Sequence, residues 1–185
     1  MLSAAARFAL AVARALLRGG FALRDGHLPP AAHDIPEAFT SVGVAPAADP
    51  AHDTRQLDHL ARLGVRRVRL DFTYGDADGP PARLLGKLAS AGYRVSLHLL
   101  QPFEEARRMP DAMAAERWRS FLADTLERFG ELADHIEVTS TVNRKRWAGY
   151  TLEGLLAAWG IAHEEVRRRG LVLAGPSITD FEPVY

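Results

Sequence analysis

Seven polar residues of this 185-residue chain stand at alternate positions in three short apolar segments. Side chains at alternate positions of a β-strand point to the same face, so each segment would carry one polar and one apolar face. A histidine, carboxylates, an arginine and hydroxyls on one shared face are the groups that acid–base chemistry and ligand hydrogen bonding require. The set comprises Arg69, Asp71, Ser96, His98, Glu137, Thr139 and Thr141.

The position along each strand predicts different roles for these residues. Asp71, His98 and Thr141 lie nearest the C-terminal ends of their segments, the end at which barrels of parallel strands bind ligands. We therefore predict that they contact a substrate. Arg69 and Glu137 lie deeper, and an unpaired buried charge is very costly, so they are predicted to form a structural ion pair.

Four loop residues extend this predicted site. Asn143 and Trp147 follow the third of these segments, where Asn143 suits a loop cap. Trp147 either stacks on a ligand or packs the loop down. Asp180 and Glu182 follow a later apolar segment, and two interpretations stay open for them: a pair of carboxylates for acid–base work, or solvated loop charges.

An alternation of predicted strands and helices positions these side chains. Three helix–glycine–strand joints recur, at Gly64, Gly92 and Gly170, as expected of βα units in a parallel sheet. The predicted strands are 39–44, 65–72, 93–100, 135–141 and 171–175, and the predicted helices are 51–63, 81–91, 113–129 and 152–169. A doubly wound sheet fits the same alternation, but its glycine-rich nucleotide fingerprint does not occur.

The polar and apolar faces of the strands favour a particular α/β architecture. Sheets covered by helices on both faces usually have strands that are apolar throughout. We therefore predict an incomplete (β/α)8 barrel of the TIM type, with about five parallel strands in the order 1-2-3-4-5 and helices on the outer face. A sheet with one face in water remains the alternative.

Residues 1–38 are predicted to precede this domain, which would span 39–185. Arg7, Arg14 and Arg18 fall on one face of an N-terminal amphipathic helix, and a proline-rich linker follows at 24–38. No uncharged run reaches the ~18 residues of a membrane-spanning helix. We expect the helix to pack against the barrel or a partner, and a membrane role is not favoured.

The segment 135–147, HIEVTSTVNRKRW, resembles the fourth strand and following loop of retaining glycoside hydrolases built on (β/α)8 barrels. In that superfamily the strand has the form E-[IV]-x-N-E-x-N and its second glutamate is the catalytic acid/base. Glu137, Val138 and Asn143 keep the frame, whereas Ser140 and Thr141 replace the asparagine and the acid/base. Residues 174–183 resemble the fifth strand and loop, so the resemblance covers roughly 39–185.

The resemblance implies a glycoside-hydrolase-like protein. A threonine hydroxyl at position 141 cannot deliver a proton as a tuned carboxylic acid does, and the nucleophile strand would lie beyond Tyr185. The chain is therefore expected to be inactive or truncated. The alternatives are a non-catalytic carbohydrate-binding or assembly protein, or activity completed by a partner chain. His98 is then a sugar contact or a hydrogen-bonded histidine inside the barrel.

Composition limits the remaining function classes. Lys and Arg total 23 and so do Asp and Glu, so the chain lacks the basic excess of nucleic-acid-binding proteins. There is no cysteine, which excludes disulfides and thiolate chemistry. We expect no metal and no cofactor, a carbohydrate as the ligand, a cytoplasmic location, and self-association or a partner chain at the edge of the fifth strand.

Overall fold

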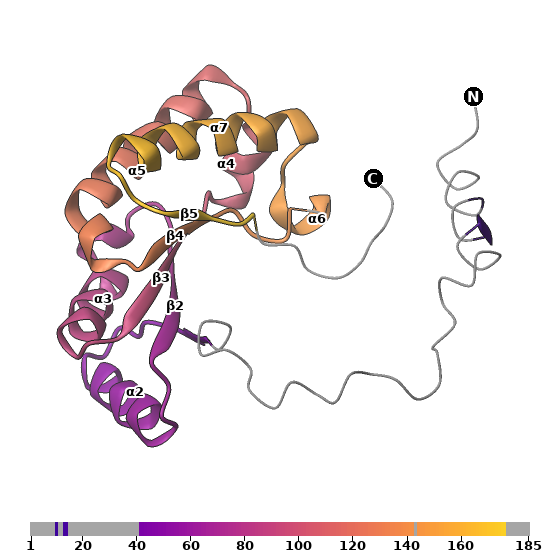
Figure 1. Ribbon diagram of the computed structural model, residues 1–185. Coiled ribbons are helices and arrows are strands. Elements are labelled where there is room, and N and C mark those ends of the chain that lie inside the picture. Colours follow the sequence, from indigo (N-terminus) through magenta and orange to yellow (C-terminus); the bar gives the residue numbers. More distant parts are fainter. Residues whose placement is uncertain (1–9, 11–12, 15–40, 143, 177–185) are drawn as a thin grey trace. The chain divides into compact units, whose positions relative to one another are not determined.

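The computed structural model describes residues 41–142 and 144–176, together with residues 10, 13 and 14 (Figure 1). Strands and helices alternate along the main part. The strands are β1 (Val42–Val44), β2 (Arg67–Phe72), β3 (Arg94–Leu99), β4 (His135–Val138) and β5 (Leu173–Ala174). The helices are α2 (Ala51–Arg62), α3 (Pro80–Ser90), α4 (Phe103–Arg108), α5 (Ala112–Phe129), α6 (Lys145–Ala148) and α7 (Leu152–Arg168), with 3₁₀ turns η2 (Asp76–Asp78) and η3 (Gly130–Leu132).

All five strands form one parallel sheet in the order β1-β2-β3-β4-β5. Each strand pairs with its neighbour in sequence, and the connecting segments cross on one side of the sheet. This confirms the predicted α/β class with five parallel strands, and it is the arrangement of an incomplete (β/α)8 barrel. The predicted N-terminal amphipathic helix and linker lie almost wholly outside the described residues, so the proposed boundary at residue 38 stays a prediction.

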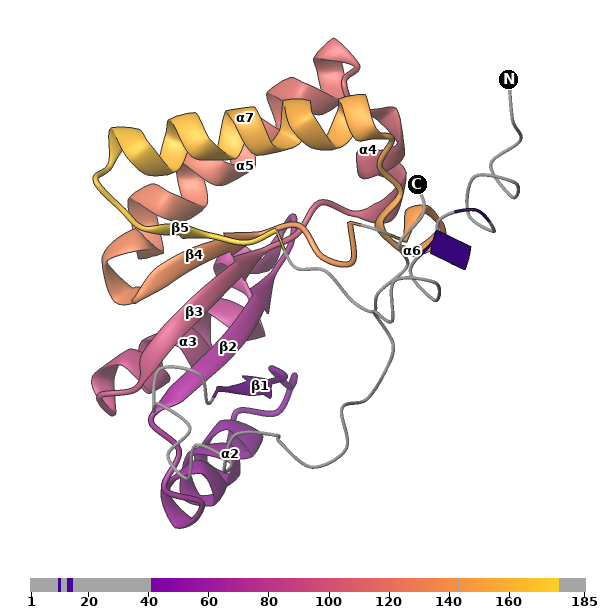
Figure 2. The same ribbon diagram turned by 45° about the vertical axis from the view of Figure 1, so that its right-hand side comes forward.

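The helices cover one face of the sheet and leave the other to the polar side chains (Figures 1 and 2). Alternation in the strands explains this division, because every second residue of β2, β3 and β4 is apolar and buried beneath α3, α5 and α7. Trp118 of α5 donates its indole N–H to the Ala158 carbonyl of α7 at 3.0 Å, which fixes these two helices together. The core includes Val68, Leu70, Phe72, Leu84, Leu88, Val95, Leu97, Leu99, Leu122, Ile136 and Val138.

Three helices end at the glycines that the sequence predicted, and a strand follows each glycine. Gly64, Gly92 and Gly170 have φ of 66°, 78° and 68°, the left-handed conformation that glycine adopts without strain at a helix end. Helices α4 and α6 were not predicted, because both are short and lie within segments read as loops. No helix among the described residues is long and apolar enough to cross a membrane.

The fourth strand is shorter than the predicted 135–141. It ends at Val138, because Thr139 and Thr141 take the left-handed conformation, with φ of 63° and 49°. That conformation is uncommon for a β-branched residue, since its branched Cβ crowds the backbone. The prediction that Thr141 extends the polar face of this strand is therefore wrong, and Thr141 belongs to the loop that follows.

Candidate functional site

Four charged or titratable side chains meet on the polar face of the sheet. The parallel register places Asp71 of β2 beside His98 of β3, and His98 beside Glu137 of β4. Arg69 reaches across from β2, so that its Nε lies 3.1 Å from Glu137 Oε2 and 3.7 Å from Asp71 Oδ1. The two carboxylates thus share one guanidinium between them.

His98 is the centre of this group, and its side chain is almost fully buried. Its Nε2 donates to the Thr139 carbonyl at 2.9 Å, and its Nδ1 lies 2.8 Å from Asp71 Oδ1. Arg69 Nη2 lies 2.6 Å from Nδ1 and 3.1 Å from Nε2, so the guanidinium sits against the ring. Because acceptors flank both ring nitrogens, His98 links the carboxylate of Asp71 to the backbone of the β4 loop.

Asp71 is held ionised by these neighbours. The hydrogen bond from His98 lowers the pKa of this carboxyl, partial burial opposes that effect, and the charges of His98 and Arg69 lower it further. The Asp71 side chain is nevertheless 59% exposed. An ionised, accessible carboxylate at the C-terminal end of β2 can accept a proton or a hydrogen bond from a ligand hydroxyl.

The left-handed turn at Thr139 joins the polar cluster to a pocket. The Thr139 carbonyl accepts the His98 hydrogen bond, and the Thr139 hydroxyl donates to the Val138 carbonyl at 2.6 Å. The chain then turns so that Ser140 and Thr141 line a pocket at the C-terminal ends of β3 and β4. Uncommon backbone conformations of this kind are found most often where a loop must present side chains to a ligand.

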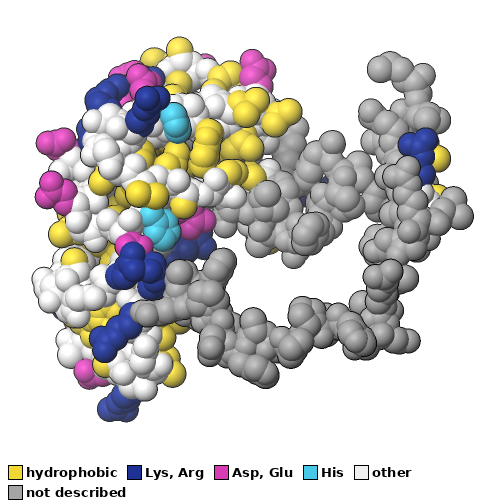
Figure 3. Space-filling view, viewed as in Figure 1, with side chains coloured by type: hydrophobic (Ala, Val, Ile, Leu, Met, Phe, Trp, Pro, Cys, Tyr) yellow, Lys and Arg dark blue, Asp and Glu magenta, His cyan; other side chains and the backbone are white. Residues whose placement is uncertain are grey.

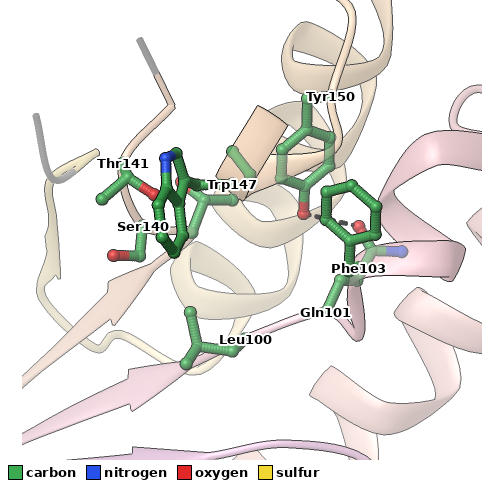
Figure 4. Close-up of a pocket in the computed structure, with 9 residues that line it drawn as sticks. Leu100, Gln101, Phe103, Ser140, Thr141, Trp147 and Tyr150 are labelled. Carbon is green, nitrogen blue, oxygen red and sulfur yellow. Dashed lines mark hydrogen bonds between the residues drawn. The ribbon is translucent and has the colours of Figure 1, made fainter. Parts of the chain in front are cut away.

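This pocket, which we call the Trp147 pocket, has a volume of about 190 Å³ (Figure 4). Ser140 and Thr141 lie on one side of the Trp147 indole, and aromatic and amide side chains from the start of α4 and α7 lie on the other. Trp147 is 72% exposed, so its ring is open to a ligand and not packed into the core. The lining residues are Leu100, Gln101, Phe103, Thr139, Ser140, Thr141, Trp147, Ala148 and Tyr150.

A hydrogen-bond chain holds the far wall of the Trp147 pocket in place. Tyr150 donates its hydroxyl to Gln101 Oε1 at 2.7 Å, and Gln101 Nε2 donates to the Tyr74 hydroxyl at 3.4 Å. Burial raises the pKa of Tyr74 to about 12 and raises that of Tyr150 further. Both phenols therefore stay protonated at neutral pH, Tyr150 donating to Gln101 and Tyr74 accepting from it.

The structure divides the residues predicted for the site into two groups. Asp71 and His98 lie together on the polar face with Arg69 and Glu137, whereas Thr141 and Trp147 line the pocket beyond it. Asn143, Asp180 and Glu182 lie outside the described residues, so their predicted roles are not tested.

Three lining residues of the Trp147 pocket, Gln101, Phe103 and Tyr150, were not predicted from the sequence. Gln101 and Phe103 directly follow β3, and that position at the C-terminal end of a parallel strand was a usable signal. Nothing in the sequence indicated that Tyr150 would line the pocket, because it reaches the pocket only through the unpredicted turn at α6. No three His, Asp or Glu side chains gather as metal ligands would in the part of the chain that the structure describes.

Comparison with known proteins gives a match in fold. No family model matches the sequence, and no curated protein matches it. Among solved structures the chain is similar to an L-ribulose 3-epimerase, with a TM-score of 0.51 and 16% sequence identity. The alignment covers 72% of this chain and 47% of that structure, so this chain spans about half the length of the protein it matches. At this identity the likeness shows the fold alone.

The match corrects the family expected from the sequence. Segment 135–147 resembles a glycoside hydrolase strand, but a solved structure that shares the fold is an L-ribulose 3-epimerase, and no family model matches the sequence. The expectation of a glycoside-hydrolase-like protein is therefore wrong. The physical reason is that alternating polar residues and a strand-ending loop follow from barrel geometry, which many chemistries share.

Proposed function

We propose that this chain binds a small monosaccharide in the Trp147 pocket and acts on it as sugar isomerases and epimerases do, by proton transfer beside a carbonyl group. The observation that carries the proposal is the composition of the pocket. An exposed indole beside hydroxyls and an amide matches the alternating apolar and hydroxylated surfaces of a sugar. The likeness in fold to a sugar epimerase supports the same class of substrate.

Five of the lining residues then have a defined contact with the sugar. Trp147 stacks on the C–H face of the sugar ring or chain, and Phe103 closes the opposite side. Ser140, Thr141 and Gln101 exchange hydrogen bonds with the sugar hydroxyls. The pocket volume of about 190 Å³ suits one small sugar unit and excludes a long oligosaccharide.

We assign the proton transfer to Asp71, which lies at the C-terminal end of β2 outside the lining of the Trp147 pocket, so the carbonyl end of the sugar would extend from the pocket over β2. The C–H bond next to the sugar carbonyl breaks, its proton passes to the Asp71 carboxylate, and the electron pair forms an enediolate whose charge rests on the former carbonyl oxygen. Arg69, 3.7 Å from Asp71, supplies the nearby positive charge. Return of the proton to the former carbonyl carbon, while the neighbouring hydroxyl gives its proton to the former carbonyl oxygen, completes isomerisation. Epimerisation at the same carbon requires a second acid on the opposite face of the enediolate.

The proposal is tested by NMR on the full chain with a panel of aldopentoses and ketopentoses, including L-ribulose, in deuterated water. We expect saturation-transfer signals from bound sugar and uptake of deuterium at the carbon beside the carbonyl. Trp147→Ala should weaken binding by about three- to tenfold, since aromatic contacts contribute roughly 0.5–1.5 kcal/mol. Trp147→Phe should restore most of it.

Asp71→Asn separates binding from chemistry. It should abolish deuterium uptake and leave the saturation-transfer signals in place. Absence of binding by every sugar in the panel, or binding that Trp147→Ala leaves unchanged, would refute the proposed function.

A further inference from the structure

The polar face of the sheet contains a second hollow, at the opposite end of the strands from the Trp147 pocket. Ser96 of β3 forms its floor, because the register places this small residue between Arg69 of β2 and His135 of β4. The longer neighbours rise around it and leave a volume of about 150 Å³. We call it the Ser96 hollow; it is lined by Ser41, Arg67, Val68, Arg69, Arg94, Ser96, Asp134, His135 and Glu137.

Three buried hydrogen-bond donors around the Ser96 hollow make no hydrogen bond, and one of them, Arg69 Nε, has an ion-pair contact to Glu137. Ser96 is only 7% exposed, and its hydroxyl has no hydrogen bond to any described residue. The Nε atoms of Arg67 and Arg69 are likewise buried without a hydrogen bond within the described part of the chain. Buried donors without acceptors are destabilising, so Ser96 and Arg67 beside the ion-paired Arg69 indicate an acceptor that the described residues do not supply.

The charges around the Ser96 hollow leave one positive charge in excess. Asp134 is shared by Arg67, at 3.0 Å, and by Arg94, whose Nε donates to it at 2.8 Å. Glu137 Oε2 lies 3.1 Å from Arg69 Nε, but the two groups are not aligned for a hydrogen bond, so the contact is an ion pair only. Three guanidiniums therefore face two carboxylates among the residues that line this hollow.

Two neighbouring groups, Asp71 and His135, also bear on the charge of the Ser96 hollow, and neither makes it negative. Asp71 contacts Arg69 at 3.7 Å, but it lies toward the other end of the strand and does not line the Ser96 hollow. His135 Nδ1 lies 3.4 Å from Asp134 Oδ2, so this ring lies against the same carboxylate as Arg67 and Arg94. The Glu137 carboxylate opposes an anion, so a ligand with a single negative charge fits better than one with two.

We propose that the Ser96 hollow binds a small singly charged oxyanion, either an inorganic one such as dihydrogen phosphate or the carboxylate of a small acid. One ligand oxygen accepts from the Ser96 hydroxyl, and the others accept from Arg67 Nε and Arg69 Nε. Hydrogen bonds between guanidinium and an oxyanion are among the stronger ones in proteins. This site is separate from the Trp147 pocket, because the two share no lining residue, although Arg69 also stands beside Asp71 in the proposed proton transfer.

Thermal unfolding of the full chain tests the proposal. Phosphate at pH 6, acetate and chloride are compared at matched ionic strength, and calorimetric titration gives the Kd. At a ligand concentration ten times Kd we expect Tm to rise by about 3 °C over chloride. A response to phosphate identifies an inorganic oxyanion, and a response to acetate identifies a carboxylate.

Two substitutions at the floor make the test specific. Ser96→Ala should weaken oxyanion binding by about tenfold, and in chloride it should unfold at the same Tm as the unmodified chain or above it, since a buried unpaired hydroxyl is removed. Ser96→Val fills the hollow and should abolish the response. Ser120→Ala, on the exposed face of α5, is the matched control and should retain it.

Equal Tm in phosphate, acetate and chloride would overturn the proposal, and so would a response that survives Ser96→Val. Trp147→Ala should retain the full oxyanion response. Failure at this hollow is therefore distinguishable from failure of the proposed sugar site.

Discussion

His98 is the residue on which the candidate site depends, because it touches both Asp71 and the Thr139 carbonyl. We predict that His98→Gln raises the pKa of the Asp71 carboxyl toward its ordinary value of about 4, since the hydrogen bond from His98 is the largest cause of its depression. NMR titration of the Asp71 carboxyl carbon measures this directly. An Asp71 pKa unchanged in His98→Gln would contradict the arrangement.

The same substitution has a second consequence at the pocket. Without the His98 donor, the Thr139 carbonyl loses the bond that helps to hold its left-handed turn, and Ser140 and Thr141 lose their fixed position. If the proposed function holds, sugar affinity should fall in His98→Gln although residue 98 does not line the pocket.

Residue types alone predicted the polar face but not the turn beyond it. Alternation placed Arg69, Asp71 and His98 on one side, because strand geometry requires it. The left-handed Thr139 could not be predicted, since threonine disfavours that conformation and only the surrounding contacts impose it. The sequence therefore predicted the features that local backbone geometry determines, such as the faces of the strands. It did not predict those that tertiary contacts determine, such as the turn at Thr139.

At the scale of elements, a buried carboxylate fastens α2 to α3. The fully buried Asp53 accepts from Arg83 Nε at 2.7 Å and lies 3.0 Å from Lys87 Nζ. Arg83 also donates to the Ala47 carbonyl at 2.6 Å, and this ties the loop before α2 into the same network. The hydrogen bond from Arg83 lowers the Asp53 pKa most, burial opposes it, and Lys87 lowers it further.

The lowered pKa of Asp53 fixes the sign of its pH dependence. Its stabilising effect is fully present above the unfolded-state value of about 4 and is lost as the pH falls through the lower folded-state pKa. We predict that Asp53→Asn reduces the free energy of unfolding by about 2 kcal/mol at pH 7, and that the difference narrows below about pH 4. Urea denaturation over this pH range checks it, with the exposed Asp58→Asn of the same helix as the control. A difference that is constant with pH would contradict this account.

At the scale of the whole molecule, the order of strands was predictable and the chemistry was not. Helix–glycine–strand joints and two-faced strands follow from the physics of a barrel wall, so they predicted the five parallel strands correctly. The glycoside hydrolase resemblance rested on the frame around Glu137 and Asn143 within one such strand and loop. Because that frame is set by the fold, it did not distinguish a hydrolase from other proteins built on the same fold.

The sheet of the described chain has an open edge at β5. This strand pairs with β4, and no described strand pairs with its other side. Apolar side chains border the edge: Leu152 and Leu156 of α7 are 74% and 62% exposed, and Val172 is 63% exposed. Figure 3 shows hydrophobic side chains gathered over this region around α7 and β5. A groove of about 340 Å³ between the end of α7 and β5 completes the surface.

An open parallel edge beside apolar surface favours pairing with another chain, so the 185-residue polypeptide is predicted to self-associate there. Sedimentation should give a mass above that of one chain that rises with concentration. Leu156→Glu places a charge on the apolar border and should shift the protein toward monomer. Met113→Glu, at an equally exposed apolar position on α5, should leave the association unchanged. If the polypeptide stays monomeric at high concentration, or if both variants dissociate it equally, the β5 edge is not the surface through which copies meet.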